Sequence, residues 1–132
     1  MDRIDLHVHV EPVAYGDLAQ AADGESSAAI RTRVAAVRQI QRERYKALPG
    51  VYCNAQLPGN RLRQFCPMTP AAEAVLRAAF ERMGLSARAY DRILRVSRTV
   101  ADMDGSEVLD SRHIAEAVQY RSLDRRFTPV SL

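Results

Sequence analysis

Apolar residues recur at three- and four-residue spacing along much of the chain, which is the pattern of amphipathic α-helices. The strongest example begins after Ser86, a residue type that caps helices by accepting a hydrogen bond from a free backbone N–H, and should end near Gly105. Its inward stripe comprises Tyr90, Ile93, Leu94, Ser97, Val100 and Ala101. Arg88 stands in the first turn and off this stripe, so we expect it to face away from the core.

The helices on either side have clear boundaries as well. Thr69 as N-cap, Pro70 at the first position and Gly84 at the end predict one helix between them. Its inner face should contain Ala72, Val75, Leu76, Ala79, Phe80 and Met83. A final helix should start at Ser111, with Ile114, Ala115, Val118 and Tyr120 inside. Short connections make these three helices neighbours, with successive helices tending to be antiparallel.

Two further helices are predicted before residue 69. A long one should run from about Ser27 to Ala47, because one face of that segment is apolar. This face is formed by Ile30, Val34, Val37, Ile40 and Leu48. A short helix should follow from about Pro58 to Phe65, with Leu62 and Phe65 turned inward.

The N-terminal residues show a different, period-two pattern. Ile4, Leu6, Val8 and Val10 alternate with Asp5, His7 and His9, as in a half-buried strand, although no partner strand is evident. Residues 11–24 contain one proline and two glycines among small and polar residues and are predicted to form a connector. The fold class is therefore all-α, a small helical bundle preceded by an N-terminal strand and an irregular linker, with residues 122–132 as a flexible tail.

Composition adds few constraints to this picture. A chain of 132 residues with 47% hydrophobic content can form one core without a metal or disulfide. Cys53 and Cys66 lack Cys-x-x-Cys spacing and should be packing residues. The absence of a secretory signal fits the cytoplasm, and no apolar run approaches the roughly 20 residues that span a bilayer, so we expect no membrane partner. The net charge of +3 decides little.

The sequence has no nucleotide-hydrolysing motif. An ATPase needs a glycine-rich loop with lysine and Ser/Thr to hold the phosphates and magnesium. Lys46 is the sole lysine and lies in Arg-Tyr-Lys-Ala-Leu-Pro, without that context. An acidic pair at the end of a buried strand is missing too. The chain alone should therefore not hydrolyse ATP.

Several ordered stretches of the chain resemble one known domain. Residues 85–102 (Leu-Ser-Ala-Arg-Ala-Tyr through Thr-Val-Ala-Asp) and 113–121 (His-Ile-Ala-Glu-Ala-Val-Gln-Tyr-Arg) are similar to the C-terminal domain of magnesium-chelatase-like AAA+ ATPases of the competence-associated ComM/YifB type. Residues 2–8, 25–34 and 54–57 match as well. The resemblance implies a piece of a larger ATPase. Residues 1–24 would be the residual end of the AAA+ core, and residues 25–121 the helical lid domain.

The same resemblance implies two arginine roles. Arg88 corresponds to the sensor 2 arginine, which reaches from the lid toward the terminal phosphates of ATP, and Arg3 to the arginine finger, which acts in trans on a neighbouring subunit's nucleotide. The implied partners are the chain's own AAA+ core and the neighbouring subunits of a hexameric ring, with DNA as the substrate. ATP and magnesium would serve the full-length protein, and the isolated fragment would hold no cofactor. Magnesium insertion into a porphyrin is the alternative parent activity.

Two other interpretations remain open from the residues themselves. Arg88 can be a solvated arginine near a helix cap. Arg31, Arg38 and Arg42 share one face of the first helix, so a stand-alone nucleic-acid-binding module is the competing class.

His7 and His9 have the spacing of a metal-binding His-x-His strand. The other histidine, His113, is expected at the start of the last helix. A metallohydrolase barrel also needs about 250 residues. We therefore expect no metal site and treat the pair as a solvated strand face.

Overall fold

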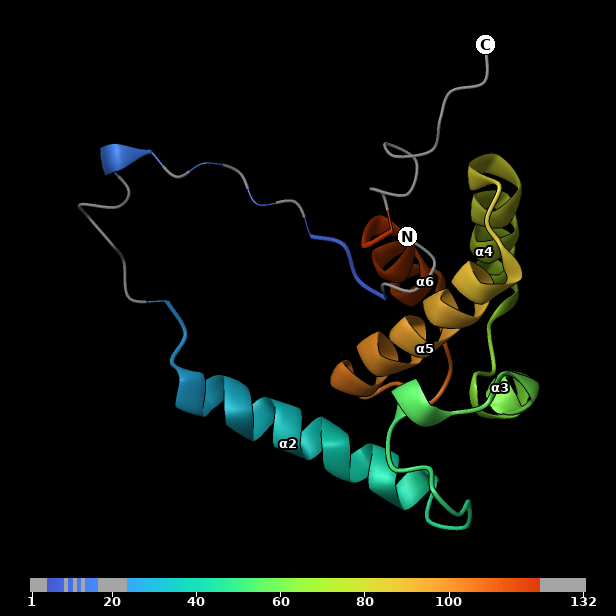
Figure 1. Ribbon diagram of the computed structural model, residues 1–132, viewed down its shortest axis with the longest axis horizontal. Coiled ribbons are helices and arrows are strands. Elements are labelled where there is room, and N and C mark those ends of the chain that lie inside the picture. Colours follow the sequence, from blue (N-terminus) through green and yellow to red (C-terminus); the bar gives the residue numbers. More distant parts are fainter. Residues whose placement is uncertain (1–4, 9, 11, 13, 17–23, 122–132) are drawn as a thin grey trace.

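The computed structural model describes residues 5–8, 10, 12, 14–16 and 24–121, and the described part is helical (Figure 1). The α-helices are α2 (Ser27–Arg44), α3 (Leu62–Phe65), α4 (Pro70–Met83), α5 (Ala87–Met103) and α6 (Ser111–Gln119). Two short 3₁₀ helices, η1 (Asn54–Gln56) and η2 (Gly59–Arg61), lie between α2 and α3. The all-α prediction is confirmed. The short helix expected over residues 58–65 is divided between η2 and α3.

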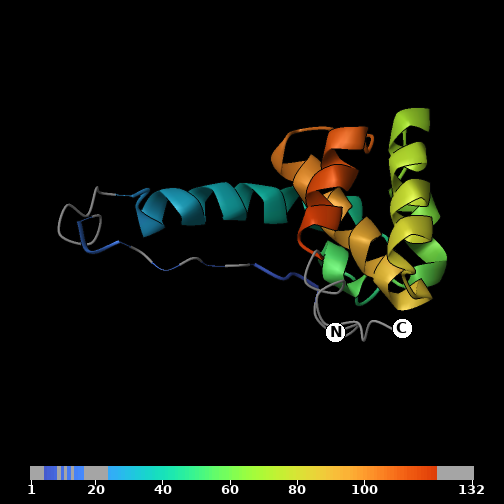
Figure 2. The same cartoon turned by 90° about the horizontal axis from the view of Figure 1, so that it is seen from above.

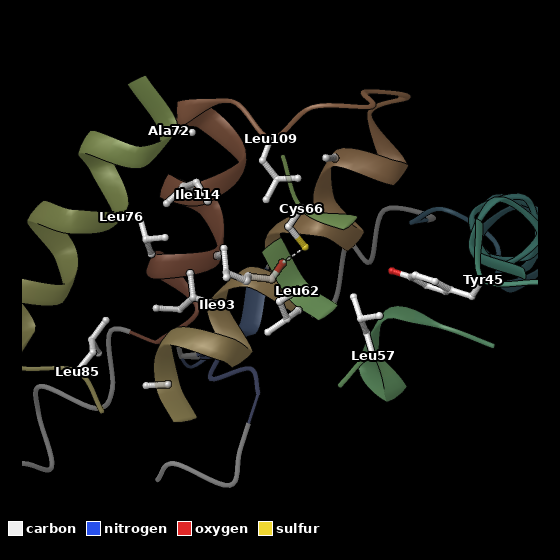
Figure 3. Packing of buried hydrophobic residues seen from close by; sticks show 14 of the residues in the cluster. Tyr45, Leu57, Leu62, Cys66, Ala72, Leu76, Leu85, Ile93, Leu109 and Ile114 are labelled. Atoms are coloured by element: carbon white, nitrogen blue, oxygen red, sulfur yellow. Dashed lines mark hydrogen bonds between the residues drawn. The ribbon is translucent and has the colours of Figure 1, made fainter. Parts of the chain in front are cut away.

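The core lies between α4, α5 and α6 and is closed on one side by the segments that precede α4 (Figure 3). Helix α6 packs against α5, as the short connection between them predicted, and also against α4, whereas the direct contact between α4 and α5 is small. The fully buried apolar residues of the core include Leu57, Leu62, Cys66, Ala72, Leu76, Ile93, Leu94, Leu109 and Ile114. Most of the predicted inward positions of α5 therefore contact the same core.

The ends of these helices follow from local chemistry. The hydroxyls of Thr69 and Ser86 accept hydrogen bonds from the N–H groups of Ala72 and Ala89, each at 3.1 Å, and so cap α4 and α5. Gly84 ends α4 with φ of 59°, a left-handed conformation that favours glycine. The predicted starts of α4, α5 and α6 are correct.

Helix α2 extends away from the bundle, and both views show its N-terminal part outside it (Figures 1 and 2). Its C-terminal end contacts α5, and Val37 is buried there, whereas Ile30, Val34 and Ile40 on the same predicted face are 41%, 46% and 43% exposed. Within α2, the predicted apolar face is thus buried only at Val37. The helix also ends at Arg44 rather than near residue 47.

The strand predicted over residues 4–10 is wrong for the residues that the structure describes there. Asp5–Val8 form no strand, and Leu6 and Val8 are exposed by 49% and 66%. The backbone N–H of His7 instead donates to the carbonyl of Tyr120 at 2.6 Å, at the C-terminal end of α6, and His7 is buried. A free helix-end carbonyl is therefore the partner of this segment, in place of a neighbouring strand.

Two predicted core positions on the helices are also corrected. Phe80 is 41% exposed and touches Tyr90 edge-on, with ring centroids 6.1 Å apart. Ala115 is exposed on α6. The predicted tail over residues 122–132 lies outside the described residues.

Candidate functional site

Arg88 occupies the exposed first turn of α5, as predicted from its position off the apolar stripe. Ser86 caps the helix directly before it. Among the described residues, no hydrogen bond or ion pair engages the Arg88 guanidinium. Since a helix N-terminus carries partial positive charge and free N–H groups, an anion placed here would meet both the backbone and this side chain.

Two further arginines continue the face that begins with Arg88. A shallow hollow of about 540 Å³ is lined by Arg88, Asp91, Arg92 and Arg95. Arg92 forms an ion pair with Asp5, and Arg95 Nε donates to the carbonyl of Leu57 at 3.1 Å. Planar guanidinium groups bind phosphate oxygens through paired N–H donors, so this row of three is chemically suited to a polyphosphate.

The other end of α5 carries a buried charged cluster that was not predicted from the sequence. Asp102, 4% exposed, pairs with Arg44 of α2 and lies 3.2 Å from Arg98 Nε. Arg98 is 1% exposed and also donates to the carbonyls of Ser106 and Glu107. The spacing of Arg98 and Asp102, four residues apart on a helix, is the one signal in the sequence that pointed to this pair.

Asn54 of η1 completes this buried network. Its side-chain amide nitrogen donates to Asp102 Oδ2 at 3.0 Å, and its oxygen accepts from the Tyr45 hydroxyl at 2.6 Å. Its backbone N–H donates to Gln41 Oε1 at 3.0 Å. One asparagine therefore links the end of α2 to α5, and the network fixes how α2 leaves the bundle.

The surroundings shift the pKa values of several groups in this region. Burial lowers the pKa of Arg98, and the neighbouring charge of Asp102 opposes that effect. Burial also acts to lower the pKa of Arg44, but the hydrogen bond and charge of Asp102 outweigh it, so this pKa is raised. Burial raises the pKa of Cys66 to about 11. The Cys66 thiol is thus neutral and buried, which agrees with the predicted packing role.

The histidines do not form a metal site in the described part of the chain. His113 Nδ1 accepts from the backbone N–H of Asp110 at 2.9 Å, and Nε2 lies 2.9 Å from Asp104 Oδ2. Because Nδ1 accepts, Nε2 carries a proton and donates to Asp104, while the ring caps α6. His7 is buried, so the predicted solvated face is wrong for this residue, and its predicted partner His9 lies outside the described residues. No group of three or more potential metal ligands occurs in the part that the structure covers.

Two further predictions concern regions that the structure covers incompletely or not at all. Arg3, the predicted arginine finger, lies outside the described residues. Within the described ranges, no helix combines the length and the apolar character needed to cross a bilayer.

Comparisons with known proteins agree on one family. Residues 24–121 match the family model described as magnesium chelatase, subunit ChlI C-terminal. The chain is 38% identical to competence protein ComM of Haemophilus influenzae over 132 residues, which cover 99% of the chain and 25% of that protein. It is 38% identical to the uncharacterized protein YifB of Escherichia coli over 126 residues, or 95% of the chain and 24% of that protein. The uncharacterized protein Rv2897c of Mycobacterium tuberculosis is 36% identical over 126 residues, which cover 96% of the chain and 25% of that protein. The chain thus spans about a quarter of the length of these relatives.

Proposed function

Because the chain belongs to the family of magnesium chelatase subunit ChlI C-terminal domains, we propose that it is the lid of a ComM/YifB-type AAA+ ATPase. In this proposal ATP is bound between a core domain and the lid, and its hydrolysis drives remodelling of DNA or translocation along it. The lid senses the nucleotide and transmits motion. The observation that carries the proposal is the exposed Arg88, which has no ion pair or hydrogen bond within the described part of the chain and begins a row of arginines.

The donor set of this row fits the phosphates of ATP. Arg88 can place two N–H donors on the oxygens of the terminal phosphate, next to a helix N-terminus that favours negative charge. Arg92 and Arg95 follow on the same side of α5 and line the same hollow. ATP with its magnesium ion supplies the phosphoryl group to be transferred, and the loop that holds them belongs to the core, since this sequence has no glycine-rich phosphate-binding loop.

The remaining parts of the proposal concern assembly. In a hexameric ring, Arg3 would act as an arginine finger on the nucleotide of the neighbouring subunit. Arginine suits that task because its charge is permanent and its fork matches charge spread over phosphoryl oxygens. The chain's partners would then be its own core and the adjacent subunits.

Substitution of Arg88 in the polypeptide that joins the core to this chain tests the proposed role. Arg88→Ala should lower ATP turnover at least about tenfold, which corresponds to loss of one charged contact to the phosphates. The far-UV circular dichroism should not change, because Arg88 is exposed. Arg82→Ala, which removes an exposed arginine from α4, is the matched control and should retain turnover. Unchanged turnover in Arg88→Ala would refute the assignment.

The substrate can be tested separately from the ATPase. The family description names a magnesium chelatase subunit, while the Haemophilus influenzae relative is named a competence protein. If the substrate is DNA, duplex or single-stranded DNA should stimulate ATP turnover of the joined polypeptide. Stimulation by a porphyrin with its chelatase partners, and none by DNA, would favour the chelatase alternative.

A second candidate function, nucleic-acid binding by this chain alone, is favoured by α2. Arg31, Arg38 and Arg42 are exposed on one side of a helix that extends from the bundle, and no ion pair engages them in the described ranges. Fluorescence anisotropy with a labelled duplex would measure binding, and each lost phosphate contact should reduce the salt slope by about 0.9.

A triple glutamine variant at these three positions should therefore bind more weakly and with a lower salt slope. The same change at Arg63, Arg77 and Arg82, which are exposed elsewhere, is the control. Absence of binding by the unmodified chain at low salt would rule out this function.

A further inference from the structure

The N-terminal segment Asp5–Val8 is attached to the bundle at two points on different helices. The carboxylate of Asp5 forms an ion pair with Arg92 of α5. Two residues later, the backbone N–H of His7 donates to the carbonyl of Tyr120 at the end of α6, with a donor–acceptor distance of 2.6 Å. The first of these attachments occupies the candidate phosphate-binding face.

Arg92 is the middle member of the arginine row that begins at Arg88. It follows Arg88 by one helical turn, about 6 Å along the axis, and Arg95 follows about 4.5 Å later. A triphosphate that contacts Arg88 is long enough to reach the next guanidinium. Asp5 therefore places a carboxylate where a second phosphate group of the same ligand would bind.

We propose that Asp5 is a built-in competitor for the arginine row, so that a polyphosphate bound at Arg88 displaces it from Arg92 and releases the Asp5–Val8 segment from α5. The inference rests on the proposed function of Arg88 and adds a means of regulation to that site. The ligand class is the polyphosphate of a nucleoside triphosphate, and the responding element is the stretch of chain that leads into the lid.

The ion pair has the exposure expected of a reversible contact. The side chains of Arg92 and Asp5 are 23% and 49% exposed, so water and salt weaken their attraction. A phosphate group carries more charge than a carboxylate and offers more acceptor oxygens to the guanidinium fork. By thermodynamic linkage, the factor by which the attached segment weakens polyphosphate binding equals the factor by which polyphosphate weakens the attachment.

Titration of the 132-residue chain with inorganic tripolyphosphate, followed by amide chemical shifts in NMR spectra at low salt, tests the proposal. Asp5→Asn should bind tripolyphosphate about two- to fivefold more tightly than the unmodified chain, which is the range for loss of an exposed competing pair. Glu43→Gln removes one exposed carboxylate from the end of α2 and is the matched control for net charge. It should change the affinity by less than about 1.5-fold, because its charge lies outside the hollow.

A second readout follows the segment itself. In the unmodified chain, saturating tripolyphosphate should increase hydrogen exchange at the His7 amide, which is bonded to Tyr120 when Asp5 is attached. Asp5→Asn should show that faster exchange without ligand. Equal affinities of Asp5→Asn and Glu43→Gln, or exchange at His7 that is independent of tripolyphosphate, would overturn the competition.

Failure of the proposed phosphate site gives a different result. Arg88→Gln should abolish tripolyphosphate shifts on α5 in both the unmodified and the Asp5→Asn background. If Arg88→Gln leaves binding intact while Asp5→Asn still tightens it, the competition holds and the role of Arg88 fails. If neither the unmodified chain nor Asp5→Asn shows shifts on α5, the competition is refuted directly.

Discussion

Asp102→Ala tests the buried network that joins α2 to α5. The substitution removes the carboxylate that compensates Arg98, whose side chain is 2% exposed. It also removes the partner of Arg44, but that side chain is 18% exposed and can gain water. Arg98 therefore determines how much unfolding free energy is lost, because its charge remains buried without an opposing charge.

The expected loss of unfolding free energy is about 3 kcal/mol. Removal of one partner of a buried ion pair costs roughly 3 to 5 kcal/mol, since the other charge is left uncompensated. The carbonyls of Ser106 and Glu107 still accept hydrogen bonds from Arg98, which places the loss at the lower end of that range. Domains of this size have a total free energy of unfolding of about 5 to 15 kcal/mol, so the variant should still fold.

Urea denaturation followed by circular dichroism at 25 °C would measure the loss. The matched control is Glu73→Ala, which breaks another arginine–carboxylate pair at four-residue helix spacing, with Arg77, but on the surface. That change should cost less than about 0.5 kcal/mol. The double variant Arg98→Met/Asp102→Leu should recover much of the stability, because it leaves no buried charge. A loss for Asp102→Ala no larger than for Glu73→Ala would refute the reasoning.

Three further predictions concern pH, thiol reactivity and a turn. The pKa of Asp104 is lowered chiefly by the hydrogen bond from His113, and that of Asp110 by the backbone N–H of Ser111. Both folded pKa values lie below the ordinary 3.8, so the two ionised carboxylates stabilise the fold fully above pH 3.8, and this stabilisation is lost as the pH falls further. Asp104→Asn should therefore make the free energy of unfolding depend less on pH in that range. At pH 8, Cys66 should react with a thiol reagent far more slowly than in urea, since it is buried and its pKa is about 11; equal rates would contradict its burial. Gly84→Ala should lower the free energy of unfolding, measured by urea denaturation, by roughly 1 to 2 kcal/mol, because φ at this position is 59°. An unchanged free energy of unfolding would mean that the left-handed turn is not required.

The parts of the fold that local chemistry determines could be predicted from the sequence. Caps at Thr69 and Ser86 and a left-handed Gly84 set the helix boundaries, and each signal lies within a few residues of the feature it controls. Which apolar residues of α2 are buried could not be predicted, because the sequence of an amphipathic helix does not show which part of its apolar face contacts the rest of the fold. The period-two pattern near residue 6 likewise predicted a strand without showing whether another strand would pair with it.

The candidate site also has one feature that could be predicted from the sequence and others that could not. The exposure of Arg88 followed from its position off the apolar stripe of its helix. Arg98 and Asp102 have the spacing of an ordinary surface pair such as Glu73 and Arg77, and only the fold buries them. Asp5 and Arg92 are 87 residues apart, so no local pattern connects them.

Helix α5 joins the two polar regions, because they lie on the same side of it. Residues 88, 92, 95, 99 and 102 follow one another at four- and three-residue spacing, which keeps them on one face, opposite the apolar stripe that contacts the core. The first half of this face is the open row of arginines, and the second half is covered by η1 and the end of α2. A force applied to Arg88 therefore acts on a helix whose far end is fixed to α2 through Asp102. Since buried hydrogen-bonded charges resist separation, α5 and the end of α2 should move as one body when a ligand engages the arginine row.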